Sequence, residues 1–221
     1  MKVLDLFSGL NGWSRPFQGR GHTVVTVDID PSFQPTLVRD IRRLRPTEIL
    51  AACGGFPDVI LASPPCETFS VASIGTHWGG GSRAYHPKTS AAIQGKQLVE
   101  ATVNLIRVLR PSVAVIENPR GVLRKLDLIP VEPKTVWYCH YGETHAKPTD
   151  LWGLPFPKGW SPRPECHNQR SNHPLSCCCR DHESAKRGAK TGTQGIKGYA
   201  NRSIIPEKLA ELIRDACEVY L

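Results

Sequence analysis

Short runs of apolar residues alternate along this chain with longer segments in which apolar residues recur every three to four positions. The short runs predict buried β-strands over residues 2–6, 22–27, 59–62, 113–116 and 135–139. The longer segments predict helices over residues 15–20, 90–109, 122–126 and 207–220. Strands that alternate with helices form parallel sheets with helices on both faces. We therefore predict an α/β fold with a doubly wound, mostly parallel sheet.

The pattern weakens after residue 153, where the composition shifts to Pro, Gly, Cys, His, Lys and Arg. We predict a main domain over 1–153, a small segment of separate function over 154–198, and a segment over 199–221 whose helix returns to the main domain. Residues 68–96 form a long connection for a compact domain, and such connections are either lids or solvated insertions.

The strand at 59–62 runs into Ser-Pro-Pro-Cys-Glu-Thr at 63–68. Proline fixes the backbone, so Cys66 is held at the carboxyl edge of the predicted sheet, where open α/β folds bind ligands. Cys66 is therefore a candidate nucleophile. An inert buried thiol is the simpler interpretation of a cysteine taken alone.

Two other predicted strands end in polar turns. The first strand enters a Gly-x-x-Gly turn at Gly9 and Gly12, where backbone can approach a ligand closely. The second ends at Asp28, about 20 residues further on, where a carboxylate can accept hydrogen bonds from ribose hydroxyls. Ile29 could lie flat on a purine. An ordinary turn carboxylate is the alternative for Asp28.

The strand at 113–116 is followed by Glu117 and Asn118. Burial raises the pKa of a carboxyl group, which lets it donate a proton near neutral pH. Glu117 is therefore a candidate general acid. Its alternative role is a capping acid, because Asn-Pro-Arg-Gly is typical of a turn.

Three of these motifs together carry a resemblance. Asp-Leu-Phe-Ser-Gly at 5–9, Pro-Pro-Cys at 64–66 and Glu-Asn-Pro at 117–119 stand in the order and approximate spacing of the DNA (cytosine-5) methyltransferase family. The resemblance covers roughly 1–153 and resumes at about 199–221. Lys-Pro-Thr-Asp-Leu-Trp at 147–152 is similar to the short bacteriophage and prophage members. The implied fold is that of Rossmann-like class I methyltransferases, with 154–198 as a reduced target-recognition insertion.

The resemblance implies a reaction in which Cys66 adds to C6 of a flipped-out cytosine. Glu117 would supply a proton or hydrogen bond to the base, and Asn118 would support the cysteine loop. The family places arginines after its sixth strand, but this chain has His-Ala-Lys-Pro-Thr at 145–149. Lys147 is the candidate substitute.

The implied cofactor is S-adenosyl-L-methionine. By resemblance its expected contacts come from the strand tips, from the acidic residue for the adenine amino group, and from the late Asn-Arg-Ser segment. These contacts are Phe7, Ser8, Gly9, Leu10, Gly12, Asp28, Ile29, Asp40, Ile41, Pro65, Asn201 and Ser203.

The formal net charge of +8 and pI near 9.2 fit a polyanionic partner, which we expect to be double-stranded DNA. No stretch of 18 apolar residues occurs, so we expect no membrane partner. No signal peptide is recognisable, and we predict a monomeric protein of the bacterial or phage-infected cytoplasm.

Cysteines and histidines cluster in the basic segment. Thiolates with imidazoles suit tetrahedral zinc, and a short polar segment needs a source of folding energy. The candidate ligands of a structural zinc ion are Cys166, His173, Cys177, Cys179 and His182. A flexible basic segment with incidental thiols is the alternative.

The sequence thus predicts an S-adenosylmethionine-dependent DNA (cytosine-5-)-methyltransferase. Two alternatives stay open. One is the same chemistry on RNA or on another pyrimidine, and the other is a non-catalytic relative that binds nucleic acid.

Overall fold

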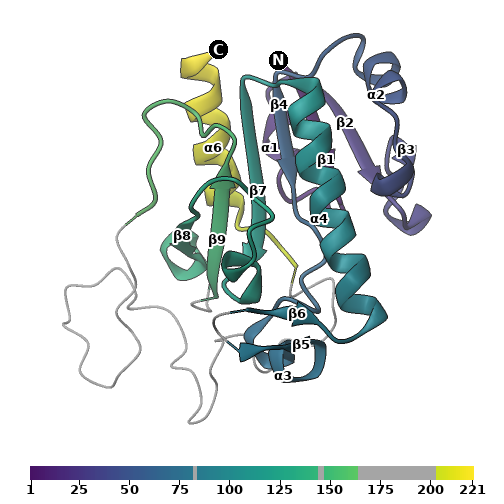
Figure 1. Cartoon of the computed structure of the whole chain (residues 1–221). Coiled ribbons are helices and arrows are strands. Elements are labelled where there is room, and N and C mark those ends of the chain that lie inside the picture. Colours follow the sequence, from purple (N-terminus) through teal and green to yellow (C-terminus); the bar gives the residue numbers. More distant parts are fainter. Residues whose placement is uncertain (82–83, 144–146, 164–202) are drawn as a thin grey trace, which may run out of the picture.

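Seven strands form one sheet in the order β3-β2-β1-β4-β7-β9-β8 (Figure 1). The computed structural model describes residues 1–81, 84–143, 147–163 and 203–221. The strands of this sheet are β1 (Lys2–Leu6), β2 (Thr23–Asp28), β3 (Leu37–Val38), β4 (Val59–Ala62), β7 (Val113–Pro119), β8 (Lys134–Trp137) and β9 (Pro148–Gly153). All neighbouring strands are parallel except β9, which runs antiparallel to both β7 and β8. The predicted doubly wound, mostly parallel sheet is confirmed.

Helices cover both faces of this sheet. The helices α2 (Pro46–Cys53) and α4 (Ser90–Leu109) pack on one face, and α1 (Arg15–Gln18) and α6 (Glu207–Tyr220) pack on the other. Strand residues alternate between the two apolar clusters, so Leu4 and Leu6 lie with α2 and α4 while Val3 lies with α1 and α6. None of the described helices combines the length and apolar composition needed to cross a bilayer.

The helix ends follow from local chemistry. The Thr89 hydroxyl accepts a hydrogen bond from the Ala92 amide and caps the start of α4, and Arg110 in a left-handed conformation ends it. The predicted bounds of α4 and α6 agree with the structure. The predicted helix at 15–20 is shorter, ending at Gln18, and the predicted helix at 122–126 is a 3₁₀-helix, η5 (Val122–Lys125).

Other elements differ from the sequence expectations. The segment expected as a long connection holds η3 (Val71–Ser73), α3 (Ile74–His77) and the paired strands β5 (Trp78–Gly79) and β6 (His86–Pro87). The predicted strand at 135–139 ends at Trp137 and continues as η6 (Tyr138–Tyr141). The structure also contains η1 (Pro31–Phe33) and η2 (Ile41–Arg43). The apolar runs are too short or too mixed with polar residues to reveal these elements.

The strand order reverses between β1 and β4. From β1 the chain passes to β2 and β3 on one side, whereas β4 and β7 lie on the other. In open α/β sheets a crevice forms at such a switch point, outside the carboxyl ends of the strands. The motifs that follow β1, β2, β4 and β7 therefore meet at one edge.

The segment after Cys66 is fastened to the segment after β7. The Val122 amide donates to the Phe69 carbonyl over 2.8 Å, and Ser70 forms an isolated bridge with Gly121. The Phe69 ring is fully buried and stacks on Trp78, with ring centroids 5.8 Å apart. A Cβ atom on Gly121 would collide with the Phe69 carbonyl oxygen, so this close approach requires glycine.

We predict that Gly121→Ala lowers the free energy of unfolding by about 1–3 kcal/mol, because backbone must shift to admit the methyl group. In a chain of this size the Tm should fall by roughly 2–4 °C for each kcal/mol, measurable by thermal unfolding. Gly75→Ala is the matched control, since a Cβ there meets nothing within 4 Å. Equal Tm values for the two variants would contradict the proposed fastening.

Candidate functional site

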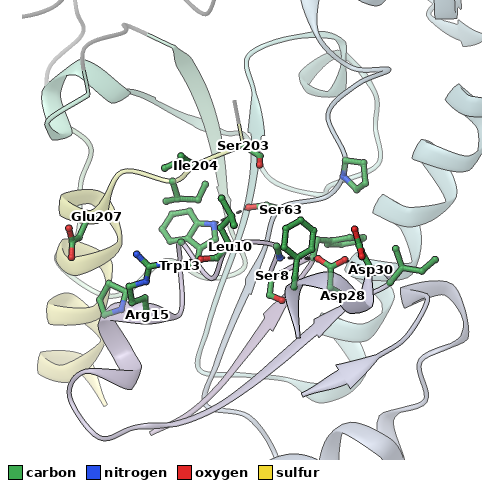
Figure 2. Close-up of a pocket in the computed structure, with 18 of the residues that line it drawn as sticks. Ser8, Leu10, Trp13, Arg15, Asp28, Asp30, Ser63, Ser203, Ile204 and Glu207 are labelled. Carbon is green, nitrogen blue, oxygen red and sulfur yellow. Dashed lines mark hydrogen bonds between the residues drawn. The ribbon is translucent and has the colours of Figure 1, made fainter. Parts of the chain in front are cut away.

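A cavity of about 540 Å³ lies at the carboxyl ends of β1, β2 and β4 (Figure 2). Its walls come from the turn after β1, the end of β2, the Ser63–Pro65 turn and the segment before α6. The lining residues are Phe7, Ser8, Gly9, Leu10, Gly12, Trp13, Arg15, Pro16, Asp28, Ile29, Asp30, Phe33, Ser63, Pro65, Glu143, Ser203, Ile204, Ile205 and Glu207. The cavity therefore occupies the switch point of the sheet.

The turn between β1 and α1 forms the floor of the cavity. Phe7, Gly9 and Asn11 have φ values of 60°, 44° and 59°, in the left-handed region that costs non-glycine residues energy. At Gly9 a Cβ would meet nothing within 4 Å, so the backbone there faces open space. At Gly12 a Cβ would lie 3.1 Å from the Ile205 Cβ. Gly9 is thus open to a ligand, whereas Gly12 permits close packing of the late segment.

The Asp28 carboxylate holds this turn in place. Its Oδ2 accepts from the Gly9 amide over 2.9 Å, and its Oδ1 accepts from the Asp30 amide over 3.0 Å. Figure 2 shows Asp28 and Asp30 at one end of the cavity and Arg15 and Glu207 at the other. Each carboxylate oxygen of Asp28 keeps acceptor capacity beyond these bonds.

An apolar surface lies beside Asp28. The Ile29 side chain is 65 % exposed although it is large and apolar, and Ile29 and Phe33 both line the cavity. Such a surface next to a carboxylate suits a ligand with a flat apolar ring and neighbouring hydroxyl groups.

Cys66 lies directly after the cavity wall formed by Pro65. Its carbonyl accepts from the Phe69 and Ser70 amides, which closes the turn, and its side chain is half-buried. Burial, followed by the negative charge of Glu117, raises the pKa of the Cys66 thiol to about 11, although Lys147 opposes the rise. In the free protein near neutral pH this thiol is therefore protonated.

Glu117 lies within β7 rather than in the turn after it, which corrects the predicted strand end at residue 116. Its side chain is buried, and burial raises the pKa of the carboxyl group; Lys147 and hydrogen bonds from Tyr138 and Ser63 oppose this rise. Asn118 donates from Nδ2 to the Pro64 carbonyl over 2.8 Å, joining β7 to the cysteine turn. Glu117 is close enough to Cys66 for its negative charge to raise the pKa of the thiol.

Lys147 lies with Cys66 and Glu117 in the same group of ionisable side chains. It precedes β9, is buried, and places Nζ 4.4 Å from the centre of the Tyr138 ring. Its positive charge favours the ionised forms of both Cys66 and Glu117. The structure therefore brings together three of the four candidate catalytic side chains, with Asn118 supporting the cysteine turn.

Sequence reasoning missed three residues of the site. The Tyr138 hydroxyl donates to Glu117 Oε1 over 3.0 Å, and the Trp13 indole donates to Ser63 Oγ, also over 3.0 Å. Ser63 stood out in the sequence only as the first residue of the turn that carries Cys66, and no role was predicted for it. Trp13 and Tyr138 read as ordinary apolar residues, because an aromatic side chain in an apolar run gives no sign of its polar contact.

Most of the expected cofactor residues line the cavity, namely Phe7, Ser8, Gly9, Leu10, Gly12, Asp28, Ile29, Pro65 and Ser203. Asp40 and Ile41 do not line it. Asp40 caps η2 and accepts hydrogen bonds from the Arg42 amide and guanidinium, and Ile41 is buried in the core beneath α4. Their expected contact with adenine remains a prediction that the cavity wall does not support.

The other expected site residues lie outside the described residues. They are Asn201 and the candidate zinc ligands Cys166, His173, Cys177, Cys179 and His182. Within residues 1–81, 84–143, 147–163 and 203–221, no three Cys, His, Asp or Glu side chains group as metal ligands do.

Two named proteins are similar to this chain in sequence. A Frog virus 3 (isolate Goorha) protein, "Probable DNA (cytosine-5)-methyltransferase", is 29 % identical over 226 residues, which cover 98 % of this chain and 100 % of that protein. "Type II methyltransferase M.AplI" of Arthrospira platensis is 29 % identical over 126 residues, which cover 56 % of this chain and 32 % of that protein. The chain thus matches the full length of the first protein but about a third of the second.

A solved structure is also similar. It is a prophage-encoded E. coli protein assigned as a DNA modification methyltransferase, with 21 % identity, a TM-score of 0.49, and coverage of 68 % of this chain and 45 % of that one. The fold of this chain is assigned from its own strand order, not from its similarity to that structure. The profile of C-5 cytosine-specific DNA methylases matches residues 1–128, more than half of the sequence. The chain therefore belongs to the C-5 cytosine-specific DNA methylase family.

Proposed function

We propose that this protein methylates C5 of a flipped-out cytosine in double-stranded DNA through a covalent adduct with Cys66. The observation that supports this proposal most strongly is the position of Cys66 and Glu117. Both lie beside a cavity of cofactor size, and they are close enough for Glu117 to raise the pKa of the thiol. This arrangement suits addition of a thiolate to a ring that is protonated at the same time.

The cavity fits S-adenosyl-L-methionine, which supplies an electrophilic methyl group when bound. Asp28 offers acceptors for the ribose hydroxyls, and Ile29 offers an apolar surface for the purine. The open space at Gly9 admits the ligand close to backbone. Arg15 and Glu207 at the far end carry the opposite charges that the carboxylate and ammonium of an amino acid require.

For the reaction to begin, Cys66 and Glu117 must together carry one proton in total. The productive state is a Cys66 thiolate beside a protonated Glu117, and this state has the same net charge as the thiol beside a carboxylate. Burial keeps the proton on Glu117 available, and Lys147 stabilises the thiolate. Protonation of Glu117 also removes the negative charge that disfavours the thiolate.

The Cys66 sulfur would bond to C6 while Glu117 gives its proton to N3, and the displaced electron pair would make C5 nucleophilic. Bound S-adenosyl-L-methionine would supply the methyl group to C5 and would leave as S-adenosylhomocysteine, whose sulfur keeps the electron pair of the broken S–CH3 bond. Loss of the C5 proton to a base breaks the C6–S bond and regenerates the thiolate. Glu117 recovers the proton from N3. The target ring must leave the stacked duplex for Cys66 to reach C6.

A duplex substrate is supported by the basic composition, with a formal net charge of +8. Methyl-transfer assays on duplex DNA, RNA and free nucleotide separate this proposal from the same chemistry on RNA or another pyrimidine. Absence of transfer to all three would favour the non-catalytic relative. The monomeric state and the cytoplasmic location remain predictions.

Removing the nucleophile should stop catalysis without emptying the cofactor pocket. We predict that Cys66→Ala abolishes methylation yet binds S-adenosylmethionine as the unaltered protein does, because residue 66 follows the cavity wall and does not line it. Isothermal titration calorimetry and a tritiated methyl-transfer assay measure the two properties. DNA containing 5-fluorocytosine should trap a covalent adduct in the unaltered protein only. Turnover by the alanine variant would falsify the mechanism.

Asp28→Ala should weaken S-adenosylmethionine binding by roughly 1.5–3 kcal/mol, the scale of a hydrogen bond to a charged group. Calorimetry measures the loss. The matched control is Asp40→Ala, a carboxylate that caps η2 and does not line the cavity. We expect the control to bind normally. An Asp40 variant that loses as much affinity as the Asp28 variant would restore the expected adenine contact.

We also propose a structural zinc ion held by Cys166, by one or two of Cys177 to Cys179, and by His173 or His182. Thiolate and imidazole donors in a short segment support it. About one equivalent of zinc per chain should appear in elemental analysis of protein purified without chelator, and chelation should remove DNA binding while S-adenosylmethionine binding persists. Well under half an equivalent, with DNA binding unchanged after chelation, would contradict the proposal.

A further inference from the structure

Glu117 is held by a tyrosine from outside the motifs that identify the family. We propose that Tyr138 is a positioning residue that fixes which oxygen of Glu117 carries the proton delivered to the base. This inference rests on the proposed function. Its basis is the hydrogen bond from the Tyr138 hydroxyl to Glu117 Oε1, 3.0 Å long and buried from solvent.

The Tyr138 hydroxyl is the donor and Glu117 Oε1 the acceptor of this hydrogen bond. Burial, and then the charge of Glu117, raises the pKa of Tyr138 well above its ordinary value, so the phenol keeps its proton. While Glu117 is ionised its Oε1 can only accept, so the Tyr138 hydroxyl is the donor of this hydrogen bond. When Glu117 is protonated, an oxygen that already accepts a hydrogen bond is the less favourable site for the proton. The proposal therefore assigns the proton to Oε2, the oxygen that does not accept from Tyr138.

The position of Tyr138 is itself constrained. Tyr138 is buried, with only 2 % of its surface exposed. It is the first residue of the 3₁₀-helix η6, directly after β8. The Lys147 ammonium lies over the Tyr138 ring, 4.4 Å from the ring centre, and this cation–π contact stabilises the position of the ring. A ring fixed in this way can orient a carboxyl group with little loss of side-chain entropy at the moment of reaction.

The other groups around Glu117 do not replace this contact. Ser63 also donates to the carboxyl group, but its oxygen accepts from the Trp13 indole at the cavity wall, so it acts from the cofactor side. Lys147 and Asp150 act on Glu117 through charge, Lys147 lowering and Asp150 raising the pKa of the carboxyl group. Tyr138 is a neutral donor to Glu117 that does not line the cavity, whereas Ser63 does.

The sign of the pH effect follows from the hydrogen bond. Tyr138 lowers the pKa of Glu117, so removing the phenol hydroxyl raises it. Turnover requires the state with one proton shared by Glu117 and Cys66. Below the Glu117 pKa both groups are protonated and the rate falls. The acid limb of the rate profile should therefore move to higher pH in Tyr138→Phe.

The test compares Tyr138→Phe with Tyr141→Phe in single-turnover methyl transfer to cytosine-containing duplex DNA across a pH series. Tyr141 lies in the same 3₁₀-helix and is equally buried, but its hydroxyl accepts from the Arg163 amide. We expect the Tyr138 variant to lose roughly 10–100-fold in rate, the cost of a misplaced catalytic group. Its acid limb should shift upward, with S-adenosylmethionine affinity unchanged. Tyr141→Phe should change neither quantity.

A rate within twofold of the unaltered protein and an unmoved acid limb in Tyr138→Phe would overturn the proposal, as would the same shift in Tyr141→Phe. If Tyr138→Phe does not fold, 3-fluorotyrosine at position 138 decides. Its more acidic phenol donates more strongly, so the acid limb should move to lower pH, and an unmoved limb counts against the proposal. Failure of the unaltered protein to methylate the DNA would instead contradict the proposed function.

Discussion

The buried carboxyl group of Glu117 is the constraint on which the rest of the active site depends. An ionised carboxylate inside a protein costs several kcal/mol unless it is paired or hydrogen-bonded. Here Tyr138 and Ser63 donate to it and Lys147 supplies positive charge, from three separate parts of the chain. Strand pairing brings these parts together, because β7, which carries Glu117, pairs with β4 before Ser63 and with β9 after Lys147, and β9 pairs with β8 before Tyr138.

The same burial controls the nucleophile. A thiol with a pKa near 11 is unreactive in the free protein. In the proposed mechanism, addition becomes favourable when a substrate ring takes the proton held by Cys66 and Glu117, so the chemistry is coupled to arrival of the base.

The sequence predicted those parts of the molecule that depend on local pattern. The strands β1 and β4 and the helices α4 and α6 follow from apolar runs, and the cavity lies where the turn residues after β1, β2 and β4 predicted a ligand site. Strand β9 was not predicted, because Thr149 and Asp150 interrupt its apolar pattern. Both residues are buried, and Asp150 accepts from Arg124 and Thr135. A polar residue whose partners lie far away in the sequence cannot be recognised as part of the core. The polar contacts of Tyr138 with Glu117 and of Trp13 with Ser63 were not predicted for the same reason.

The close contact between Gly12 and Ile205 has a consequence for synthesis of the protein. One wall of the cofactor cavity comes from the segment before α6, almost two hundred residues after the turn that forms its floor. While the chain emerges from the ribosome, the floor can fold long before the wall exists. A nascent chain should therefore carry Cys66 and Glu117 for some time without a complete cofactor pocket, and methyl transfer should begin only once the last helix has packed against α1.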